Sequence, residues 1–418
     1  MKKVRVKDVA SINALKFNFK GRIEVDYLDT GSLTENCFER TEKIILGKDI
    51  LPSRAQRAVK DKTILYSTVR PRQHHFGIVE DTSENLVVSS GFVTIDADPE
   101  SIDPFFLYYS ITRPDKIEHI CRIADSAVSS YPSVNPDDIA NLEIEIEESL
   151  DDQRKIASVL HDIELKMRSN TSVIAELESM AKDIYDYWFV QFDFPDENGK
   201  PYKSSGGNMI WNEELKREIP EGWIVKQLNE MCSFSNGINY DKNEVGDKKY
   251  HIVNVRNITA SSFLLDNSEF DEIELRSSQA DRYMINDSDI LVARSGTPGA
   301  VRLLLNNDQN TIFCGFIIRC IPKNDKFRFY LSFALKQYEG TNATTTGGSI
   351  LQNVSQDTLG RVSVVVPQSE IVDTFSSFVS GLFTRMQNAI EENQQLASLR
   401  DWLLPMLMNG QVKVGGKA

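Results

Sequence analysis

Two long stretches of the chain repeat apolar residues at alternating steps of four and three. The first runs from Asp151 to about Phe192 and contains no Gly or Pro. Its repeating positions are Ile156, Leu160, Ile163, Met167, Asn170, Ile174, Leu177, Ala181, Ile184 and Trp188. This heptad spacing is typical of a seam between paired helices, whereas a helix on a globular core shows a wider stripe. The pattern predicts a helix of about forty residues, roughly 60 Å long.

A second stretch of the same kind begins after Pro367. Its seam positions are Phe375, Val379, Leu382, Met386, Ala389, Asn393, Leu396 and Leu403, with Arg400 as a polar step. Pro405 and Gly410 are expected to end this helix. We expect the two helices to pair, because their seams match and a buried Asn in each commonly fixes register. The alternative is that each helix packs only on its own globular domain.

The regions before the two helices resemble each other, with a repeat period of about 220 residues. DKTILYSTVRPRQHHFGIV (61–79) matches DSDILVARSGTPGAVRLL (287–304), SSGFVTID (89–96) matches FCGFIIRC (313–320), and SVNPDDIANLEIEI (133–146) matches NVSQDTLGRVSVVV (353–366). Both regions mix short strands with a helix and lack regular strand–helix alternation. The sequence therefore predicts two similar α+β domains separated by a long antiparallel two-helix coiled coil, as a pseudo-twofold internal repeat.

This pattern divides the chain into six segments. They are a first domain (1–148), a helix (149–192), a linker (193–220), a second domain (221–366), a second helix (367–413) and a tail (414–418). The linker is assigned because that segment is rich in Gly, Ser, Pro and charged residues, which also suits a surface loop.

Composition narrows the class of protein. Of the 418 residues, 41% are hydrophobic and 26% charged, which is ordinary for a soluble globular protein. A run of about 18 apolar residues and a signal peptide are both missing, so no membrane association is expected. The five cysteines are odd in number and form no CxxC pair, which fits a reducing cytoplasm.

The net charge of −14 argues against nucleic acid as a partner. Basic residues nevertheless cluster locally, at 54–62 and again at 70–75. An acidic protein can still bind DNA through basic faces, but only weakly unless partner subunits supply more phosphate contacts.

Several segments resemble one known family. ESLDDQRKIASVLHDIELKMRSNTSVIAELESMAKDIYDYWFV is similar to the central conserved region of Type I restriction–modification specificity subunits. VPQSEIVDTFSSFVSGLFTRMQNAIEENQQLASLRDWLLPMLMNGQV resembles their C-terminal conserved region, although its entry, SEIVDTF, is less typical than DDQRKIA in the first helix. LPSRAQRAVKDKTILYSTVRP and DILVARSGTPG resemble two classes of their target-recognition domains. The likeness spans essentially the whole chain.

The resemblance implies a non-catalytic protein that binds double-stranded DNA. Each recognition domain would read one half of an asymmetric, interrupted site, and the paired helices would set the unread spacer. Two methyltransferase subunits would dock on the helices, and motor–nuclease subunits would join them. S-adenosylmethionine, ATP and magnesium would be used by these partners, and this chain would bind no cofactor.

Arginine is the side chain best suited to read DNA, because its fork matches the two acceptors of guanine. The first-domain candidates are Ser53, Arg54, Arg57, Lys60, Arg70 and Arg72, with Ser53 and Lys60 assigned to phosphate. The second-domain candidates are Arg256, Asn257, Arg294, Ser295 and Thr297, where Asn could pair with adenine. The alternative for each arginine is an ordinary surface ion pair.

The motifs of DNA-modifying enzymes are incomplete. An adenine methyltransferase needs an Asn/Asp-Pro-Pro-aromatic loop, and NPDD at 135–138 favours a turn or helix entry instead. Asp152, Glu164 and Lys166 match a nuclease pattern loosely, but they fall on the first long helix and suit a solvated face. The Gly-Lys pairs at 47, 199 and 416 are followed by the wrong residue for a phosphate-binding loop.

Two further motifs stay open. His74-His75 has no Cys or acidic residue at metal-ligand spacing, so a turn or DNA-facing role is favoured. Gly-Thr-Pro-Gly at 296–299 could cradle a phosphate or form a plain hairpin turn. No catalytic or metal-binding residue is predicted. The competing functions are a methyltransferase or nuclease acting alone, and a coiled-coil scaffold that binds only protein.

Overall fold

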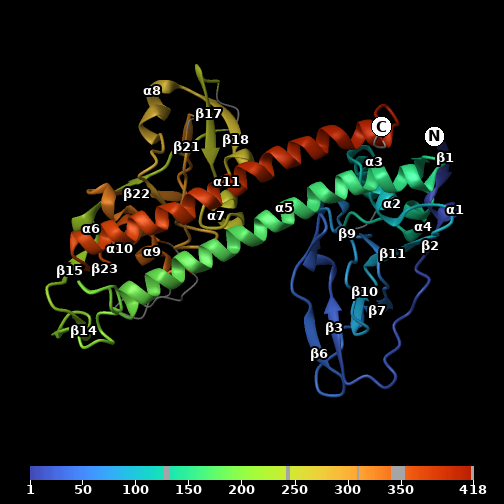
Figure 1. The fold of residues 1–418 in the computed structure, drawn as a ribbon. Helices are drawn as coiled ribbons and strands as arrows, with labels where there is room; N and C mark the ends of the chain where they lie inside the picture. Colours follow the sequence, from blue (N-terminus) through green and yellow to red (C-terminus); the bar gives the residue numbers. More distant parts are fainter. Residues whose placement is uncertain (127–130, 242–244, 308–309, 340–353, 416–418) are drawn as a thin grey trace. The chain divides into compact units, whose positions relative to one another are not determined.

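The computed structural model describes residues 1–126, 131–241, 245–307, 310–339 and 354–415. The chain forms two compact units (Figure 1). Unit 1 consists of Met1–Met167 and Gln395–Ala418, and unit 2 of Arg168–Gln394. The helices α5 (Leu150–Tyr185) and α11 (Ser369–Met408) each contribute to both units. Within the described ranges, no helix combines the length and apolar character needed to cross a membrane.

Unit 1 is built on two four-stranded sheets. One has the order β2–β11–β8–β9, formed by Ala10–Ile12, Phe92–Ala97, Ile64–Ser67 and Phe76–Ile78. The other has the order β6–β3–β10–β7, formed by Glu42–Ile45, Glu24–Leu28, Leu86–Ser89 and Ala55–Ala58, with β3 and β10 parallel. Strand β1 (Lys2–Arg5) pairs with β12 (Glu143–Ile146). The helices are α1 (Val6–Val9), α2 (Pro104–Ile111), α3 (Pro114–Ser126) and α4 (Pro136–Ala140), beside the short hairpin β4–β5 (Leu33–Thr34, Cys37–Phe38).

Unit 2 has a corresponding set of strands. Its larger sheet has the order β16–β22–β19–β20, formed by Cys232–Asn236, Ile317–Pro322, Ile290–Ala293 and Val301–Leu303. A second sheet, β18–β17–β21, consists of Asp271–Leu275, Lys248–Val253 and Thr311–Phe313, with β17 and β21 parallel. Strand β15 (Ile224–Gln227) pairs with β23 (Ser363–Val366). The helices are α6 (Leu228–Met231), α7 (Val255–Ala260), α8 (Ser277–Ala280), α9 (Arg328–Lys336) and α10 (Gln356–Gly360).

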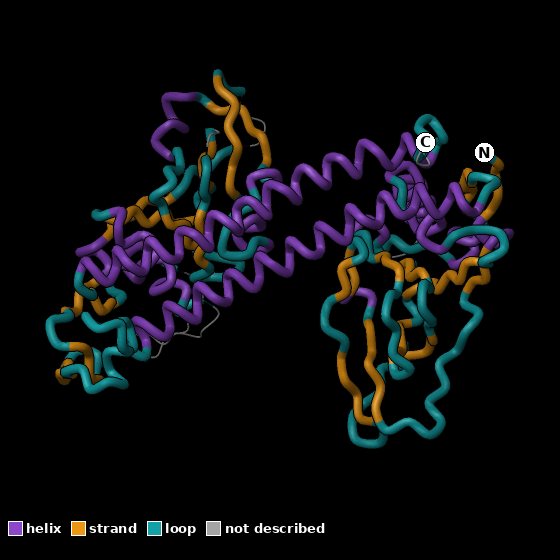
Figure 2. Tube along the Cα trace, viewed as in Figure 1, coloured by secondary structure: helices purple, strands orange, loops and turns teal. Residues whose placement is uncertain are grey.

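The first four-stranded sheet has the same strand order in both units, whereas the second sheet has four strands in unit 1 and three in unit 2. In each, four antiparallel strands form one sheet and a parallel pair lies in another. The matched sequences 89–96 and 313–320 contain the corresponding strands β11 and β22. Helices and strands are mixed within each unit, as the tube in Figure 2 shows, which confirms the α+β prediction.

The core of unit 1 joins a sheet to parts of both long helices. Ile95 of β11 and Phe106 of α2 are fully buried, and Leu160 of α5 and Leu407 of α11 belong to the same apolar cluster. These helices therefore pack on the domain as well as near each other. Packing of the long helices on a globular domain, which was the alternative to helix pairing, therefore also occurs in the structure.

In unit 2, α5 and α11 likewise pack both on the domain and against each other. Tyr185 of α5 and Phe375 of α11 have ring centroids 6.1 Å apart, in one cluster with Phe333 of α9. Phe383, which lies outside the predicted seam, packs against Phe263 of the domain with centroids 5.4 Å apart. The apolar stripe of α11 is therefore wider than the heptad seam predicts, because it covers the domain too.

The predicted seam positions are shielded from solvent. The buried ones are Ile156, Leu160, Ile163, Asn170, Ile174, Leu177, Ala181, Phe375, Val379, Leu382, Met386 and Ala389. The half-buried ones are Met167, Ile184, Trp188, Asn393, Leu396, Arg400 and Leu403.

The two seam asparagines contact each other within unit 2. Asn170 Nδ2 donates to Asn393 Oδ1 at 3.0 Å and to Glu392 Oε2 at 2.8 Å. With the contact between Tyr185 and Phe375, this pairing makes the helices antiparallel in this unit. Because a buried amide without a partner is costly, the pair favours one register over its neighbours.

Two expectations about segment ends need correction. The segment 193–220, predicted as a linker or surface loop, contains the hairpin β13–β14 (Met209–Asn212, Arg217–Pro220), and Phe194 and Ile219 are buried in the core of unit 2. Pro405 does not end the second helix, since α11 continues to Met408. Pro405 and Asp401 are both exposed, so water can replace the hydrogen bond that the proline removes.

Candidate nucleic-acid interface

A turn between β10 and β11 connects the loops that carry the first-domain arginines. Ser90 N donates to the carbonyl oxygen of Arg54 at 2.7 Å. Thr68 donates to Gly91 O from its backbone N and from its Oγ1, both at 2.9 Å. The loop before β7 and the loop after β8 therefore meet at this turn. We call Ser53, Arg54, Arg70 and Tyr131 rim 1.

The residues of rim 1 lie on the surface of unit 1. All four residues are exposed, and Tyr131 has 60% of its surface accessible. The Arg70 guanidinium lies 5.3 Å from the ring centroid of Tyr131, and Arg70 N donates to Pro132 O at 2.9 Å. Neither Arg54 nor Arg70 forms a salt bridge with any described residue. Arginine beside an exposed aromatic ring is suited to base edges and unstacked bases.

Unit 2 has a corresponding turn between β21 and β22. Arg294, at the position that matches Thr68, donates from N to Phe316 O at 2.9 Å and from Nη1 to Gly315 O at 3.2 Å. Phe316 is 61% exposed. We call Arg294, Ser295, Thr297 and Phe316 rim 2, whose first three residues are half-buried.

The glycines in the two turns are matched by the sequence repeat, and a neighbouring side chain lies close to each. A Cβ at Gly91 would lie 2.8 Å from Thr30 Cγ2, and one at Gly315 would lie 2.1 Å from Asn239 Oδ1. A larger residue at either position would require the side chain of Thr30 or Asn239 to move. Each rim therefore lies beside a turn that contains a matched glycine.

Of three further first-domain candidates, Arg72 and Lys60 lie near acidic side chains of the protein, and Arg57 is half-buried. Arg72 forms ion pairs with Asp125 at 2.7 Å and Glu118 at 3.6 Å. Lys60 is exposed, with its Nζ 3.8 Å from Asp96 Oδ1. Arg57 lies half-buried on the edge strand β7, and burial lowers its pKa. Its Nε is buried and has no hydrogen-bond partner among the described residues.

The second-domain candidates on α7 are also engaged. Arg256 is exposed but pairs with Asp271 at 2.6 Å. Asn257 is only 4% exposed, and its Nδ2 donates to Glu269 O at 2.8 Å while its Oδ1 accepts from Asn254 N at 2.8 Å. The Asn257 amide therefore caps and anchors α7, because its polar atoms are satisfied inside the protein.

The turn at 294–299 lies against α7. A Cβ at Gly296 would approach Val255 Cγ1 to 2.7 Å, so rim 2 and the start of α7 are neighbours. Ala293 N donates to Ala300 O, and Gly299 N to Ala293 O, both at 2.9 Å. The Gly-Thr-Pro-Gly segment is therefore the hairpin connection between β19 and β20, the plainer of the two interpretations.

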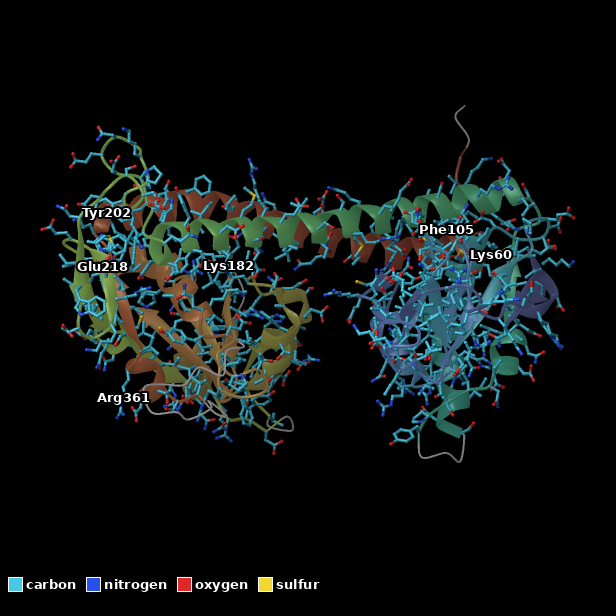
Figure 3. All side chains as sticks on the ribbon, turned by 90° about the horizontal axis from the view of Figure 1, so that it is seen from below. Lys60, Phe105, Lys182, Tyr202, Glu218 and Arg361 are labelled. Carbon is cyan, nitrogen blue, oxygen red and sulfur yellow. The ribbon has the colours of Figure 1, made fainter. Side chains whose placement is uncertain are left out.

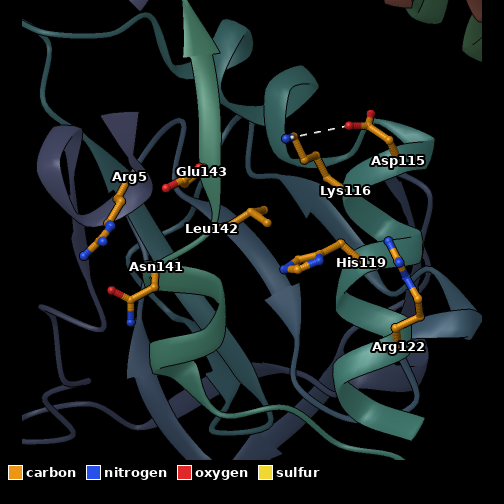
Figure 4. A pocket seen from close by; sticks show the side chains of 8 residues that line it. All are labelled: Arg5, Asp115, Lys116, His119, Arg122, Asn141, Leu142 and Glu143. Atoms are coloured by element: carbon orange, nitrogen blue, oxygen red, sulfur yellow. Dashed lines mark ion pairs between the residues drawn. The ribbon is translucent and has the colours of Figure 1, made fainter. Parts of the chain in front are cut away.

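A basic pocket in unit 1 was missed by the sequence analysis. It has a volume of about 590 Å³ and is lined by Arg5, Asp115, Lys116, His119, Arg122, Asn141, Leu142 and Glu143 (Figure 4). Lys116 pairs with Asp115 at 3.6 Å, whereas Arg5 and Arg122 form no salt bridge within the described part of the chain. The basic residues of α3 recur at steps of three, which is the signal that could have revealed this face.

The residues considered as catalytic or metal-binding candidates form hydrogen bonds or ion pairs with other residues of the chain. Asn135 N donates to Asp138 Oδ2 at 2.7 Å where α4 begins, as expected for a helix entry. Asp152 is exposed and pairs with Lys155 at 3.4 Å. His74 Nδ1 lies 2.6 Å from Glu35 Oε1, an acidic neighbour that is distant in sequence. No group of His, Cys, Asp or Glu among the described residues is arranged to hold a metal ion.

Comparison with known proteins identifies the family. The family model described as "Type I restriction modification DNA specificity domain" matches residues 1–179 and 220–392, so the chain belongs to this family of DNA specificity subunits. The HindI specificity subunit of Haemophilus influenzae is 23% identical over 466 residues, covering 97% of this chain and 98% of the relative. The MjaIX specificity subunit of Methanocaldococcus jannaschii is 24% identical, with 84% and 78% covered.

A solved structure supports the fold. The S subunit of a Type I restriction–modification system from M. genitalium superimposes with a TM-score of 0.55 at 15% sequence identity. The match covers 100% of this chain and 96% of that one. At this identity the likeness shows a common fold only.

Proposed function

We propose that this chain reads a bipartite, asymmetric double-stranded DNA site, with each unit recognising one half. The observation that carries the proposal is the pair of rims. They lie on corresponding turns of two units with one topology, yet they carry different side chains. Arg54, Arg70 and Tyr131 in one rim and Arg294 and Phe316 in the other would read different bases.

In this proposal, the length of the paired helices sets the distance between the two half-sites. They form an antiparallel two-helix coiled coil that relates two recognition domains by a pseudo-twofold axis. The supporting observations are the Asn170–Asn393 hydrogen bond and the burial of the seam. A stiff rod converts helix length into half-site spacing, as dimer geometry does in other DNA-binding proteins. A pseudo-symmetric frame also offers nearly equivalent docking places to two identical partners.

The chemistry belongs to partner subunits in this proposal. Two methyltransferase subunits, using S-adenosylmethionine, dock on the helices and modify one adenine in each half-site. Motor–nuclease subunits, using ATP and magnesium, cleave unmodified DNA. The net charge of −14 supports this division, because DNA affinity then depends on phosphate contacts that the partners supply. Arg5 and Arg122 in the basic pocket are this chain's own candidates for phosphate contact.

Methylome sequencing of the host with and without this gene tests the proposal. We expect deletion to remove one bipartite methylated-adenine motif and complementation to restore it. An unchanged set of methylated motifs, with the methyltransferase gene expressed, would contradict the proposed function.

Replacing Arg54 or Arg70 with alanine is expected to weaken specific binding by about 1–3 kcal/mol. The loss should fall on the half-site read by unit 1, because both guanidinium groups belong to rim 1. Fluorescence polarisation of the methyltransferase complex on DNA with single-base changes in each half-site measures it. Lys43→Ala is the matched control, since Lys43 pairs with Glu24 at 2.9 Å on the opposite edge strand of the sheet. Equal losses for the control would show that net charge, not base recognition, is responsible.

A further inference from the structure

A pocket in unit 2 combines aromatic walls with acidic side chains. Its volume is about 640 Å³, and it lies where α5 ends and α11 begins. The half-buried rings of Trp188 and Tyr202 supply most of the accessible aromatic surface, and Phe194 and Trp223 are buried behind it. Asp196, Glu197, Glu221 and Glu370 supply the carboxyl groups. None of the described residues that line it is basic.

The aromatic residues are stacked in a fixed order. The ring of Phe194 lies between Tyr202 and Trp223, with centroids 4.6 Å and 4.9 Å away and interplanar angles of 17° and 24°. Gly207 N donates to Tyr202 O at 2.8 Å, and a Cβ at Gly207 would lie 2.5 Å from the Tyr202 ring. The glycine therefore allows the loop to pass close to the ring of this tyrosine.

The loop that carries the acidic groups is held by hydrogen bonds. Asp193 accepts from Ser204 N at 2.7 Å and from Ser204 Oγ at 2.6 Å. Asp196 Oδ1 accepts from the backbone N of Asn198 and of Lys200, both at 2.8 Å. These bonds lower the pKa of Asp196, so its carboxylate is charged at neutral pH. A Gly- and Ser-rich segment is thus preorganised, which lowers the entropic cost of binding a ligand there.

The negative charge and the aromatic rings of the pocket indicate which ligand it can bind. Four carboxyl groups repel DNA phosphates and attract a cation. Aromatic walls favour a planar, weakly hydrated guanidinium with an apolar stem over a compact ammonium. A carboxylate rim also accepts the N–H groups of a guanidinium in paired hydrogen bonds.

We propose that this pocket receives an arginine side chain of the methyltransferase subunit. This inference rests on the proposed function, which places that subunit on α5 and α11. The pocket then fixes the subunit at unit 2, because an arginine in contact with the rings of Trp188 and Tyr202 and with the carboxylates resists displacement. The segment 193–208, assigned to a linker from its composition, becomes part of the docking surface.

Neutralising two pocket carboxylates tests the inference. The full-length variant Glu197→Gln/Glu370→Gln is expected to bind the methyltransferase subunit about 10- to 100-fold more weakly, because two charge-assisted partners are lost. Isothermal titration calorimetry at two salt concentrations measures affinity and its screening. Both glutamates are exposed, so the unfolding temperature should change little. The control, Glu213→Gln/Glu218→Gln, makes the same charge change on the hairpin β13–β14, and neither residue lines the pocket. Glu218 is labelled in Figure 3.

The results separate this inference from the proposed function. Normal binding by the pocket variant, with normal binding by wild type, overturns the arginine site and leaves DNA recognition standing. Failure of the wild-type chain to bind the methyltransferase overturns both. A charge swap gives the positive identification, because an arginine-to-glutamate change in the partner should weaken wild-type binding and restore binding to Glu197→Arg. If no arginine of the partner behaves in this way, the inference is wrong.

Discussion

Replacing Phe375 with alanine is expected to lower the free energy of unfolding of unit 2 by about 3–5 kcal/mol. Phe375 is completely buried, and the rings of Tyr185, Trp188, Phe189 and Phe333 surround it with centroids between 4.9 and 6.1 Å away. Those rings come from α5, the turn after it and α9, so they cannot all collapse into the cavity. The loss includes both the transfer free energy of the ring and the cost of the remaining void.

Phe378 on the same helix provides the control. It is 52% exposed, so Phe378→Ala removes an aromatic ring without opening an internal cavity. We expect a change within about 0.5 kcal/mol, as for surface substitutions generally. Chemical denaturation followed by far-UV circular dichroism compares the two variants. Similar losses for both would mean that the core of unit 2 does not depend on this aromatic cluster.

The long helices were predictable from sequence because their signal is local. Steps of four and three place Ile174 and Leu177 on one face regardless of what the rest of the chain does. The contact between Asn170 and Asn393 follows from the same seam, since the polar positions of two paired helices are most stable opposite each other. The width of the α11 stripe was not predictable, because Phe383 faces residues that are distant in sequence.

The candidate interface was harder to predict, because side-chain availability depends on tertiary neighbours. Arg70 and Arg72 are two residues apart, yet Arg70 is exposed beside Tyr131 whereas Arg72 is held by Asp125. Asn257 lies beside an exposed arginine but is buried as a cap of α7. Composition predicted a linker or surface loop for residues 193–220, and 193–208 form a loop, but composition did not reveal that hydrogen bonds to Asp193 and Asp196 hold this loop in place.

The rims suggest why one fold can serve different DNA sequences. The turns at Gly91 and Gly315 are closely approached by the side chains of Thr30 and Asn239, while the exposed side chains beside the turns differ. If the rims contact DNA as proposed, substitutions at Tyr131 or Phe316 change the surface presented to DNA without disturbing a buried core, since both residues are exposed. Recognition can therefore vary at low cost in stability, because the variable positions lie on loops held by a rigid scaffold.

Inserting four residues into both long helices is expected to lengthen the DNA spacer by one or two base pairs. The insertions belong between Met167 and Arg168 and between Gln394 and Gln395, where the two units meet in the sequence and the Asn170–Asn393 pair is kept. Four residues add about 6 Å and about 40° of rotation to an α-helix. One base pair adds about 3.4 Å and about 35° to DNA, so translation and rotation change together. Methylome sequencing should find both half-sites unchanged in sequence and further apart.

Insertion into α5 alone distinguishes rigid paired helices that set the half-site spacing from a flexible connection between the two units. The extra turn would then shift the seam of one helix against the other on one side of the insertion, leaving apolar positions opposite polar ones. We expect that variant to lose the bipartite motif, whereas the double insertion keeps a motif with a longer spacer. If both variants methylate the original motif, the spacing is set by the partner subunits or by flexible attachment. The helices would then support the two units without measuring the distance between them.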